Sequence, residues 1–216
     1  MIVRLLILLQ ERTFADALAT RLEAEPDMEI VAALNARAPS PHLFTGSRAD
    51  VALLDGDFPG NAAFGLCEEL SLRVQTPYVV ILSHSSDPKR ILRAIASGAV
   101  GWVRKDESLD RLIDVIHGVA RGETWLPTRE TGQVLRLLLR RPDPGQYGGS
   151  QLLATLTQRE QEVLVCLAEG TGRRAMAEHL HMSPNTVRTH LQNLMAKLGV
   201  HSALEAVALT RSQLIR

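Results

Sequence analysis

Cysteine is scarce in this chain, whose 216 residues include only Cys67 and Cys166. The two cysteines stand far apart, and neither has a spacing typical of a metal site. We therefore expect neither a disulfide framework nor a cysteine-ligated metal. We interpret both as small buried apolar residues of a protein in a reducing compartment, the cytoplasm.

An excess of one charge and long apolar runs are also missing. The chain carries 24 basic and 24 acidic residues, so its formal net charge is zero. No apolar run is long enough to span a membrane. Arg4 interrupts the first apolar stretch, and no small-residue cleavage site follows it. We therefore expect a cytoplasmic protein without a signal peptide or a membrane partner. Residues 150–216 hold seven basic and five acidic residues, and this small excess argues against loose polycationic binding to nucleic acid.

The first 120 residues alternate between apolar runs of strand length and helical patterns. The expected strands are residues 3–9, 28–34, 50–55, 78–83 and 101–105, and the expected helices are residues 14–23, 62–73, 88–97 and 109–119. Segment 36–49 contains two prolines and a glycine, so its helix is expected to be short or absent. Five strands separated by helices predict a doubly wound, five-stranded parallel sheet of the α/β class.

A linker separates this region from the rest of the chain. Residues 140–151 contain two prolines, three glycines and several polar residues, which is linker composition. Residues 130–139, just before it, have the pattern of a short helix. We therefore predict a first domain at residues 1–121, a linker helix and flexible linker at residues 122–151, and a second domain at residues 152–216.

Residues 183–199 have the pattern of a helix that inserts into a partner. Ser183 is suited to cap the first turn, Pro184 to occupy the first helical position, and Gly199 to end the helix. One narrow stripe is apolar: Val187, Leu191, Leu194 and Leu198. The other face carries slender, donor-rich side chains of the types that reach base edges in a major groove: Asn185, Arg188, Thr189 and Gln192. In isolation, this window also fits an ordinary surface helix.

The flanking sequence favours DNA binding. Thr157 and Glu160 have the spacing of a capping box that opens a helix, and Gly170 ends it. A short helix is expected at residues 173–180 and a last helix at residues 202–212. A helix, a tight turn and a second helix with a polar outer face make up the helix-turn-helix arrangement, whose second helix lies in the major groove. Residues 152–216 are therefore expected to form an all-α domain of four helices.

Three polar residues end neighbouring strands of the first region. Asp55 ends the third expected strand, Ser83 the fourth and Lys105 the fifth. In a doubly wound sheet the carboxyl ends of the strands share one edge, where the working site lies. We therefore expect these three side chains to meet there.

Both halves resemble known families. Residues 156–209 resemble the DNA-binding domain of LuxR-type regulators, through matches that include Thr186-Val187 and Lys197-Leu198-Gly199. Residues 2–121 resemble the receiver domain of two-component response regulators, through DVALLD with Pro59-Gly60 and through SGAVGWVRKD. The whole chain is therefore similar to a response regulator of the NarL/FixJ type, with a flavodoxin-like receiver. This resemblance implies a transcription regulator and not an enzyme.

The resemblance also implies roles for individual residues. Contacts with DNA bases fall on Arg188, Thr189 and Gln192, and contacts with DNA phosphates fall on Asn185, Thr186 and Lys197. The family places its dimer contact on the last helix, so we expect a homodimer on double-stranded promoter DNA with paired half-sites. In the receiver, Asp55 is the phospho-acceptor position, and the switch positions are Ser83, Trp102 and Lys105.

One part of the receiver pattern is missing. The family has two acidic residues at the end of the first strand, which hold Mg²⁺ together with the phospho-acceptor. Here those positions are Leu9 and Gln10. Leucine cannot coordinate a metal, and a glutamine amide is a neutral, weak ligand. We therefore expect no bound magnesium and no other metal or cofactor. A makeshift site made of Glu11, Asp55 and Asp57 is the alternative.

Three functions remain open on the sequence alone. In the first, the protein is a DNA-binding regulator in which Asp55 is a retained acid paired with Lys105. Its control would come from dimerisation, from a protein partner, or from a small ligand in the pocket that Leu9 makes less charged. In the second, it is a conventional regulator activated by phosphorylation of Asp55. In the third, the receiver acts mainly as a protein-docking module.

Overall fold

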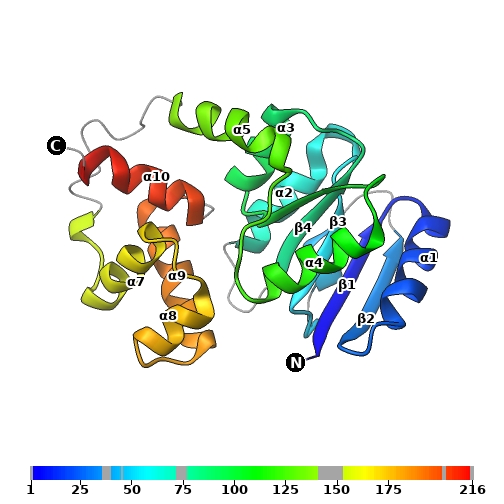
Figure 1. Cartoon of the computed structure of the whole chain (residues 1–216), viewed down its shortest axis with the longest axis horizontal. Coiled ribbons are helices and arrows are strands. Elements are labelled where there is room, and N and C mark those ends of the chain that lie inside the picture. Colours follow the sequence, from blue (N-terminus) through cyan, green and yellow to red (C-terminus); the bar gives the residue numbers. More distant parts are fainter. Residues whose placement is uncertain are drawn as a thin grey trace.

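The computed structural model describes residues 2–35, 40–44, 46–71, 77–140, 153–200 and 203–214. These residues form an α/β part built on one sheet and an all-helical part that follows it in the chain (Figure 1). Residues 141–151 of the expected linker lie outside the described residues. Among the described helices, none has the length and apolar character needed to cross a bilayer.

The sheet consists of five parallel strands: β1 (Val3–Leu9), β2 (Met28–Asn35), β3 (Val51–Asp55), β4 (Tyr78–Ser83) and β5 (Gly101–Arg104). Their order in the sheet is β2-β1-β3-β4-β5. This is the flavodoxin-like order of doubly wound sheets, so the predicted fold class is confirmed. The order puts the carboxyl ends of β1, β3 and β4 side by side at one edge of the sheet.

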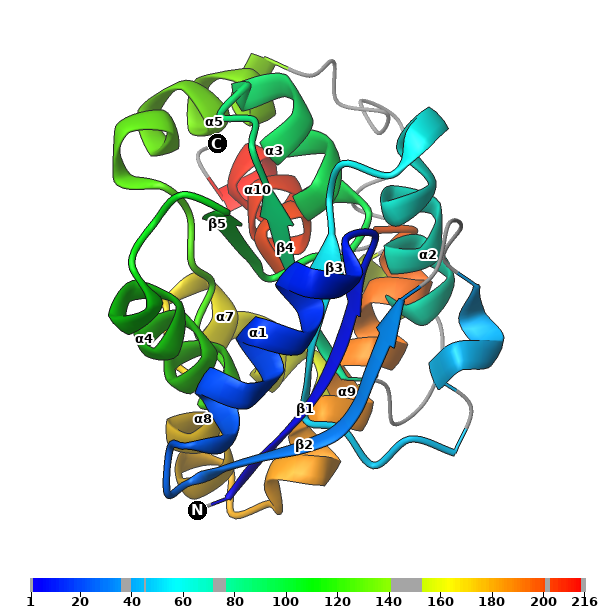
Figure 2. The same cartoon turned by 90° about the vertical axis from the view of Figure 1, so that its right-hand side faces the viewer.

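Helices cover both faces of the sheet. The helices α1 (Arg12–Glu23) and α4 (Leu109–Ala120) pack on one face (Figure 2), and α2 (Ala62–Ser71) and α3 (Pro88–Ala96) pack on the other. Strand β1 supplies both cores: Leu5, Ile7 and Leu9 face α1 and α4, whereas Leu6 and Leu8 face α2 and α3. A strand buried on both faces needs a continuous apolar run, which is the pattern of residues 3–9.

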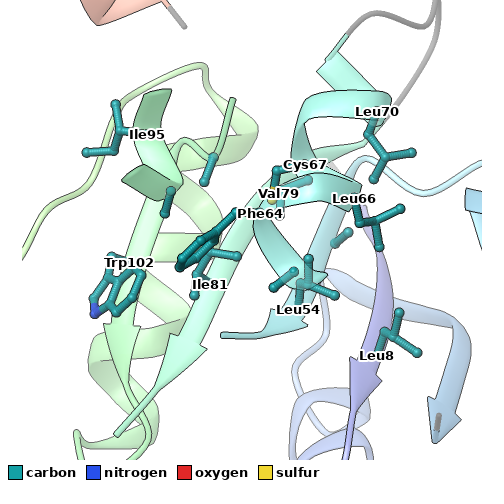
Figure 3. Close-up of a cluster of buried hydrophobic side chains, with 14 of the residues drawn as sticks. Leu8, Leu54, Phe64, Leu66, Cys67, Leu70, Val79, Ile81, Ile95 and Trp102 are labelled. Atoms are coloured by element: carbon teal, nitrogen blue, oxygen red, sulfur yellow. The ribbon is translucent and has the colours of Figure 1, made fainter. Parts of the chain in front are cut away.

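The core under α2 and α3 is mainly aliphatic and contains Phe64 and Trp102 (Figure 3). The rings of Phe64 and Trp102 lie with their centroids 6.5 Å apart and tilted by 38°. Cys67 belongs to the same core, and both cysteines are free and buried, as the sequence predicted. Burial raises the pKa of the Cys67 thiol to about 12, so this thiol is protonated and unreactive at neutral pH.

The connection between β2 and β3 departs from the regular alternation. Its described residues form one 3₁₀ turn, η1 (Pro41–Phe44), in place of a full helix. This confirms the expectation of a short or missing helix in segment 36–49, of which residues 36–39 and 45 lie outside the described residues. A second 3₁₀ turn, η2 (Pro59–Asn61), leads from β3 into α2.

The segment after α4 follows the outer edge of the sheet. Trp125 forms an isolated parallel bridge with Gly101, and its backbone oxygen accepts a hydrogen bond from the N–H of Trp102. The indole of Trp125 lies so close over Gly118 that a Cβ there would stand 2.0 Å from Nε1. Helix α5 (Thr128–Arg140) comes next and buries Val134 in the core under α2 and α3. The helix expected near residues 130–139 therefore packs on the sheet domain.

The helical part contains α7 (Gln158–Ala168), α8 (Arg173–His179), α9 (Pro184–Leu198) and α10 (Ala203–Leu214). Thr157 and Glu160 form the predicted capping box at the start of α7. At the start of α9, the Ser183 hydroxyl accepts a hydrogen bond from the N–H of Thr186. Gly199 ends α9 in the left-handed region, at φ 66°. The predicted apolar stripe of α9 is buried throughout: Val187, Leu191, Leu194 and Leu198.

The two parts also pack against each other. Leu204 and Ala208 of α10 lie against the core under α2 and α3, the same core that buries Val134 and contacts Leu137 of α5. Helix α10 contacts α5, which lies above it in Figure 1. Part of the apolar surface of the expected dimer helix is therefore covered within one chain.

Candidate functional sites at the sheet edge and on helix α9

The three polar residues predicted to meet at the carboxyl edge of the sheet lie together. Lys105 follows β5, and its Nζ lies 2.9 Å from Oδ1 of Asp55 at the end of β3. Their side chains are 6% and 1% exposed, so this is a buried ion pair. Ser83 ends β4, and its residue is buried as well. Because water is excluded, the charges of Lys105 and Asp55 depend on each other for neutralisation.

Both carboxylate oxygens of Asp55 are already engaged. In addition to Lys105, Oδ1 accepts a hydrogen bond of 2.9 Å from the backbone N–H of Asp57. Oδ2 accepts one of 3.0 Å from the backbone N–H of Gln10. The side chain therefore joins β3 to the end of β1 and to β5, and it acts as a structural acid in this arrangement.

Asp57, two residues further on, collects donors from the neighbouring strand and loop. Its Oδ1 accepts a hydrogen bond of 2.6 Å from the Ser83 hydroxyl, and its Oδ2 accepts one of 3.0 Å from the backbone N–H of His84. The ring Nδ1 of His84 lies 3.0 Å from Oδ2, and Lys105 Nζ lies 3.3 Å from it. Burial alone would raise the pKa of Asp57, but the hydrogen bonds from Ser83 and His84, with the charge of Lys105, lower it to about 2.

A glycine makes this arrangement possible. A Cβ on Gly56 would stand 2.5 Å from Cγ2 of Ile81 and 3.1 Å from Cβ of Ser83. The chain therefore passes close to β4 only because residue 56 has no side chain. Arg90, at the start of α3, donates a hydrogen bond of 2.7 Å to the Gly56 carbonyl and lies 3.6 Å from Oδ1 of Asp57.

Sequence reasoning considered Asp57 only as a metal ligand and did not identify His84 or Arg90. The signal that could have found this cluster is the second aspartate of Asp55-Gly56-Asp57, which stands where strand ends also bring Ser83 and Lys105. Its partners could not be inferred, because they depend on the path of the loop after β4.

Trp102, the predicted switch aromatic, points into the core. It is 2% exposed, and its Nε1 donates a hydrogen bond of 3.1 Å to the Ser85 carbonyl. The backbone N–H of Ser85 in turn donates to the Ser83 hydroxyl at 3.1 Å. The indole is thereby tied to the loop that carries the donors of Asp57.

The residues at the end of β1 do not fit a magnesium ion. Leu9 is fully buried in the core under α1 and α4, and Gln10 donates its N–H to Asp55. The side-chain amide of Asn35, at the end of β2, donates hydrogen bonds to the carbonyls of Leu9 and Gln10. Within the described part of the chain, no group of three His, Cys, Asp or Glu side chains could hold a metal, and this includes the makeshift set considered above.

A pocket of about 290 Å³ lies beside Lys105, on the face covered by α1 and α4. Apolar side chains from both helices line it, among them Phe14, Leu18 and Leu112, together with Arg21 of α1. Leu9 is not part of its lining. The pocket expected beside Leu9 stays a prediction, since the space described here is lined by other residues.

Helix α9 presents the residues predicted to contact DNA on the side away from its buried stripe. Thr186 and Thr189 are exposed, and Arg188 and Gln192 are partly exposed. The Thr186 hydroxyl lies 2.8 Å from that of Ser183, at the start of the helix. The side chain of Asn185 lies outside the described residues.

Arg188 contacts the sheet domain. Its guanidinium carbon lies 5.0 Å from the centroid of the Tyr78 ring at the start of β4, which is cation–π geometry. The same end of the sheet carries Asp50, which forms an ion pair of 2.9 Å with Arg4. Burial raises the pKa of Asp50, but the bonds from Arg4 and, to a smaller extent, the charge of Arg188 bring it below its usual value.

Lys197, predicted to contact a DNA phosphate, has an internal partner. Its Nζ lies 2.7 Å from Oε2 of Glu160, which is buried and also accepts a hydrogen bond from the N–H of Thr157. Burial raises the pKa of Glu160, but the bonds from Lys197 and Thr157 outweigh this effect and lower it. Lys197 therefore joins the end of α9 to the capping box of α7.

Comparison with known families gives two matches, one for each part of the chain. The profile described as "Response regulator receiver domain" matches residues 5–117, and that described as "Bacterial regulatory proteins, luxR family" matches residues 154–210. The transcriptional regulatory protein UhpA of Escherichia coli K12 is 31% identical over 187 residues, which is 87% of each chain. The nitrate/nitrite response regulator protein NarP of the same organism is 30% identical and covers 89% of this chain and 86% of its own.

Solved structures of response regulators share the fold. The response regulator ChrA of a heme-sensing two-component system is 26% identical, covers 100% of this chain and 99% of its own, and superposes with a TM-score of 0.50. The response regulator RcsB in its complex with DNA is 17% identical, covers 98% and 99% of the two chains, and has a TM-score of 0.56. At that identity the second likeness concerns the fold alone.

Proposed function

The chain belongs to the DNA-binding response regulators that join a receiver domain to a LuxR-family helix-turn-helix domain, and on this premise we propose that its receiver operates without phosphorylation of Asp55. Proteins of this family are transcription regulators and not enzymes. We assign the receiver to residues 1–121, the linker region to residues 122–151 and the DNA-binding domain to residues 152–216, in a cytoplasmic protein.

The pairing of Asp55 with Lys105, at an edge where Leu9 replaces an acid, carries this proposal. Phosphoryl transfer to a carboxylate needs an accessible oxygen and a metal that neutralises the incoming charge. Here both oxygens of Asp55 are engaged and buried, and the residues at the end of β1 do not fit magnesium. Asp55 is therefore better suited to hold β1, β3 and β5 together than to accept a phosphoryl group.

The contacts between the two parts suggest what regulation acts on. Arg188, proposed to contact a DNA base, lies over Tyr78, and α10, proposed to form the dimer contact, packs on the receiver core. An arginine cannot lie over Tyr78 and enter a major groove at the same time. Separation of the two parts would therefore release the base-contacting face and the dimer helix together, for a homodimer on paired half-sites.

The pocket beside Lys105 supports a small ligand as the input. It is largely apolar, and its charged lining residues are three cations and one acid: Arg21, Arg104, Lys105 and Glu107. This chemistry suits a molecule with an apolar body and one acidic group. Such a ligand would contact the aliphatic part of Lys105. Because the ammonium group of Lys105 pairs with Asp55 and Asp57, ligand binding would be coupled to the edge of the sheet.

Incubation of the full chain with acetyl phosphate and Mg²⁺, followed by intact mass measurement, tests the proposal. We expect no stoichiometric phosphoryl adduct and no change in DNA affinity. A stoichiometric adduct that is lost in Asp55→Asn, together with stronger DNA binding, would overturn the proposal.

That outcome would favour a conventional phospho-switch. The observation in favour of this second candidate is that Asp55, Ser83, Lys105 and Trp102 lie around one sheet edge, as the resemblance implies. The missing acids at Leu9 and Gln10 are the reason why it ranks second.

A further inference from the structure

The carboxylate of Asp57 is surrounded by a complete set of hydrogen-bond donors and cations. Oδ1 accepts from the Ser83 hydroxyl at 2.6 Å and lies 3.6 Å from Nη2 of Arg90. Oδ2 accepts from the backbone N–H of His84 at 3.0 Å and lies 3.3 Å from Lys105 Nζ, with the His84 ring at 3.0 Å. These donors come from the end of β4, the loop after it, the start of α3 and the residue after β5.

A hydroxyl, a backbone N–H, an ammonium and a guanidinium that converge on one point form a site for an oxyanion. Two positive charges lie at this site, those of Lys105 and Arg90. Lys105 also pairs with Asp55, so the acid at position 55 neutralises only one of them. Without an anion these donors would be held close together with an excess of positive charge. The side chain of Asp57 is only 25% exposed, so water replaces it poorly.

We propose that Asp57 is an internal anion, which occupies an oxyanion-binding site of the receiver and holds the loop after β4 in a fixed arrangement. This inference rests on the proposed function, because it explains how the sheet edge is ordered without a phosphoryl group on Asp55. The external ligand that the same donors would take is a small tetrahedral oxyanion, of which inorganic phosphate is the simplest probe.

The fixed loop is connected to the contact between the two parts. Ser85 in this loop donates to Ser83 and accepts from the Trp102 indole. Asp87 caps α3 through the N–H of Lys89, and α3 packs against α5, which shares its core with α10. The occupant of the oxyanion site thus determines the position of the element on which the dimer helix rests.

The variant Asp57→Ala tests this proposal in the full chain, because it removes the internal anion and leaves the donors in place. We expect its Tm to fall below that of the wild type and to rise again with added phosphate along a saturable curve, since a ligand that binds only the folded state stabilises it. Chloride at matched ionic strength should not restore the Tm. The wild type should show no saturable response to phosphate.

Asp106→Ala is the matched control, since it removes one carboxylate next to Lys105 whose ion pair is with Arg104. We expect this variant to behave like the wild type in the phosphate titration. If Asp57→Ala does not fold, Asp57→Asn serves instead, because its amide oxygen still accepts from Ser83 while the negative charge is lost. It should bind phosphate more weakly than the alanine variant would, but still in a saturable way.

The outcomes separate this inference from the proposed function. The proposal that Asp57 is an internal anion would be overturned if phosphate raised the Tm equally in the wild type, the control and the Asp57 variants. It would also be overturned if phosphate did not raise the Tm of either Asp57 variant. Neither result depends on phosphorylation of Asp55. A phosphoryl adduct on Asp55 of the wild type would overturn the proposed function, and the mass measurement detects it independently.

Discussion

Arg188 lies over the ring of Tyr78, with its guanidinium carbon 5.0 Å from the ring centroid. A side chain proposed to contact a DNA base is thereby held on the receiver domain, about 110 residues earlier in the chain. Any DNA complex that uses Arg188 must first break this contact. The contact therefore sets part of the free-energy difference between the structure described above and a DNA-bound form.

Removal of the aromatic ring should favour DNA binding. A cation–π contact at a partly exposed site contributes about 0.5–1 kcal/mol, so Tyr78→Ala should raise affinity for a promoter fragment roughly two- to fivefold. Fluorescence anisotropy with the full chain measures this change. Tyr78→Phe keeps the ring and should bind like the wild type, and equal affinities of all three proteins would contradict the prediction.

Replacement of the arginine itself should weaken sequence-specific binding. If Arg188 contacts a guanine, Arg188→Ala should cost about 1–3 kcal/mol on the specific site and relax the preference at one base position. Affinity for a set of single-base variants of the site reports both effects. Should binding weaken equally on every sequence, Arg188 would be a phosphate contact.

Lys197 should contribute to the stability of the DNA-binding domain as well as to DNA affinity. Lys197→Ala leaves the buried carboxylate of Glu160 without its cation, and we expect a loss of about 1–2 kcal/mol, less than for a fully buried pair because Lys197 is partly exposed. Urea unfolding measures this loss. If the interaction is the cause, Glu160→Gln should reduce the effect of Lys197→Ala in a double-mutant cycle.

Lys105 should be critical for folding of the receiver. Lys105→Met leaves Asp55 buried without a cation, so we expect a loss of about 3–5 kcal/mol in the free energy of unfolding. The neighbouring variant Arg104→Ala breaks only an exposed pair with Asp106 and should leave stability nearly unchanged. A similar effect of both variants would show that the buried pair is not a major contributor.

Asp57 should make stability depend on pH only under acidic conditions. Its pKa is about 2 in the folded protein against 3.8 in the unfolded chain, so its contribution is complete above about pH 4 and is lost as the pH falls toward 2. Because the carboxylate is partly exposed, we expect this contribution to be at most about 2 kcal/mol. The stability difference between the wild type and Asp57→Asn should be constant from pH 5 to 7 and shrink below pH 4. A difference that stays constant from pH 7 down to pH 2 would contradict the prediction.

Much of the fold follows from local patterns. The apolar run at residues 3–9 predicts a strand buried on both faces, and Leu5 and Leu6 indeed enter different cores. The caps at Thr157 and Ser183 predict the starts of α7 and α9, because a side chain that accepts from the first turn is a local requirement. The meeting of Asp55 with Lys105 also follows, since parallel strands bring their carboxyl ends to one edge.

Other features depended on how distant parts of the chain are arranged. The pocket beside Lys105 was not predicted, because it depends on how α1 and α4 pack around the end of β5. Helix α5 lies in the predicted linker region, and the burial of its Val134 in the receiver core was not predicted. A helical pattern specifies which face is apolar and does not specify which surface covers that face.

The sequence by itself determined the order of strands and helices, the caps, the buried stripe of α9 and the placement of Asp55 and Lys105 at one edge of the sheet, because each depends on short spacings or on one rule of sheet topology. Only the tertiary structure decided the donors of Asp57 and the position of Arg188. The first depend on the path of the loop after β4, and the second depends on how two domains pack. Both are long-range arrangements of side chains, which no periodicity in the sequence records.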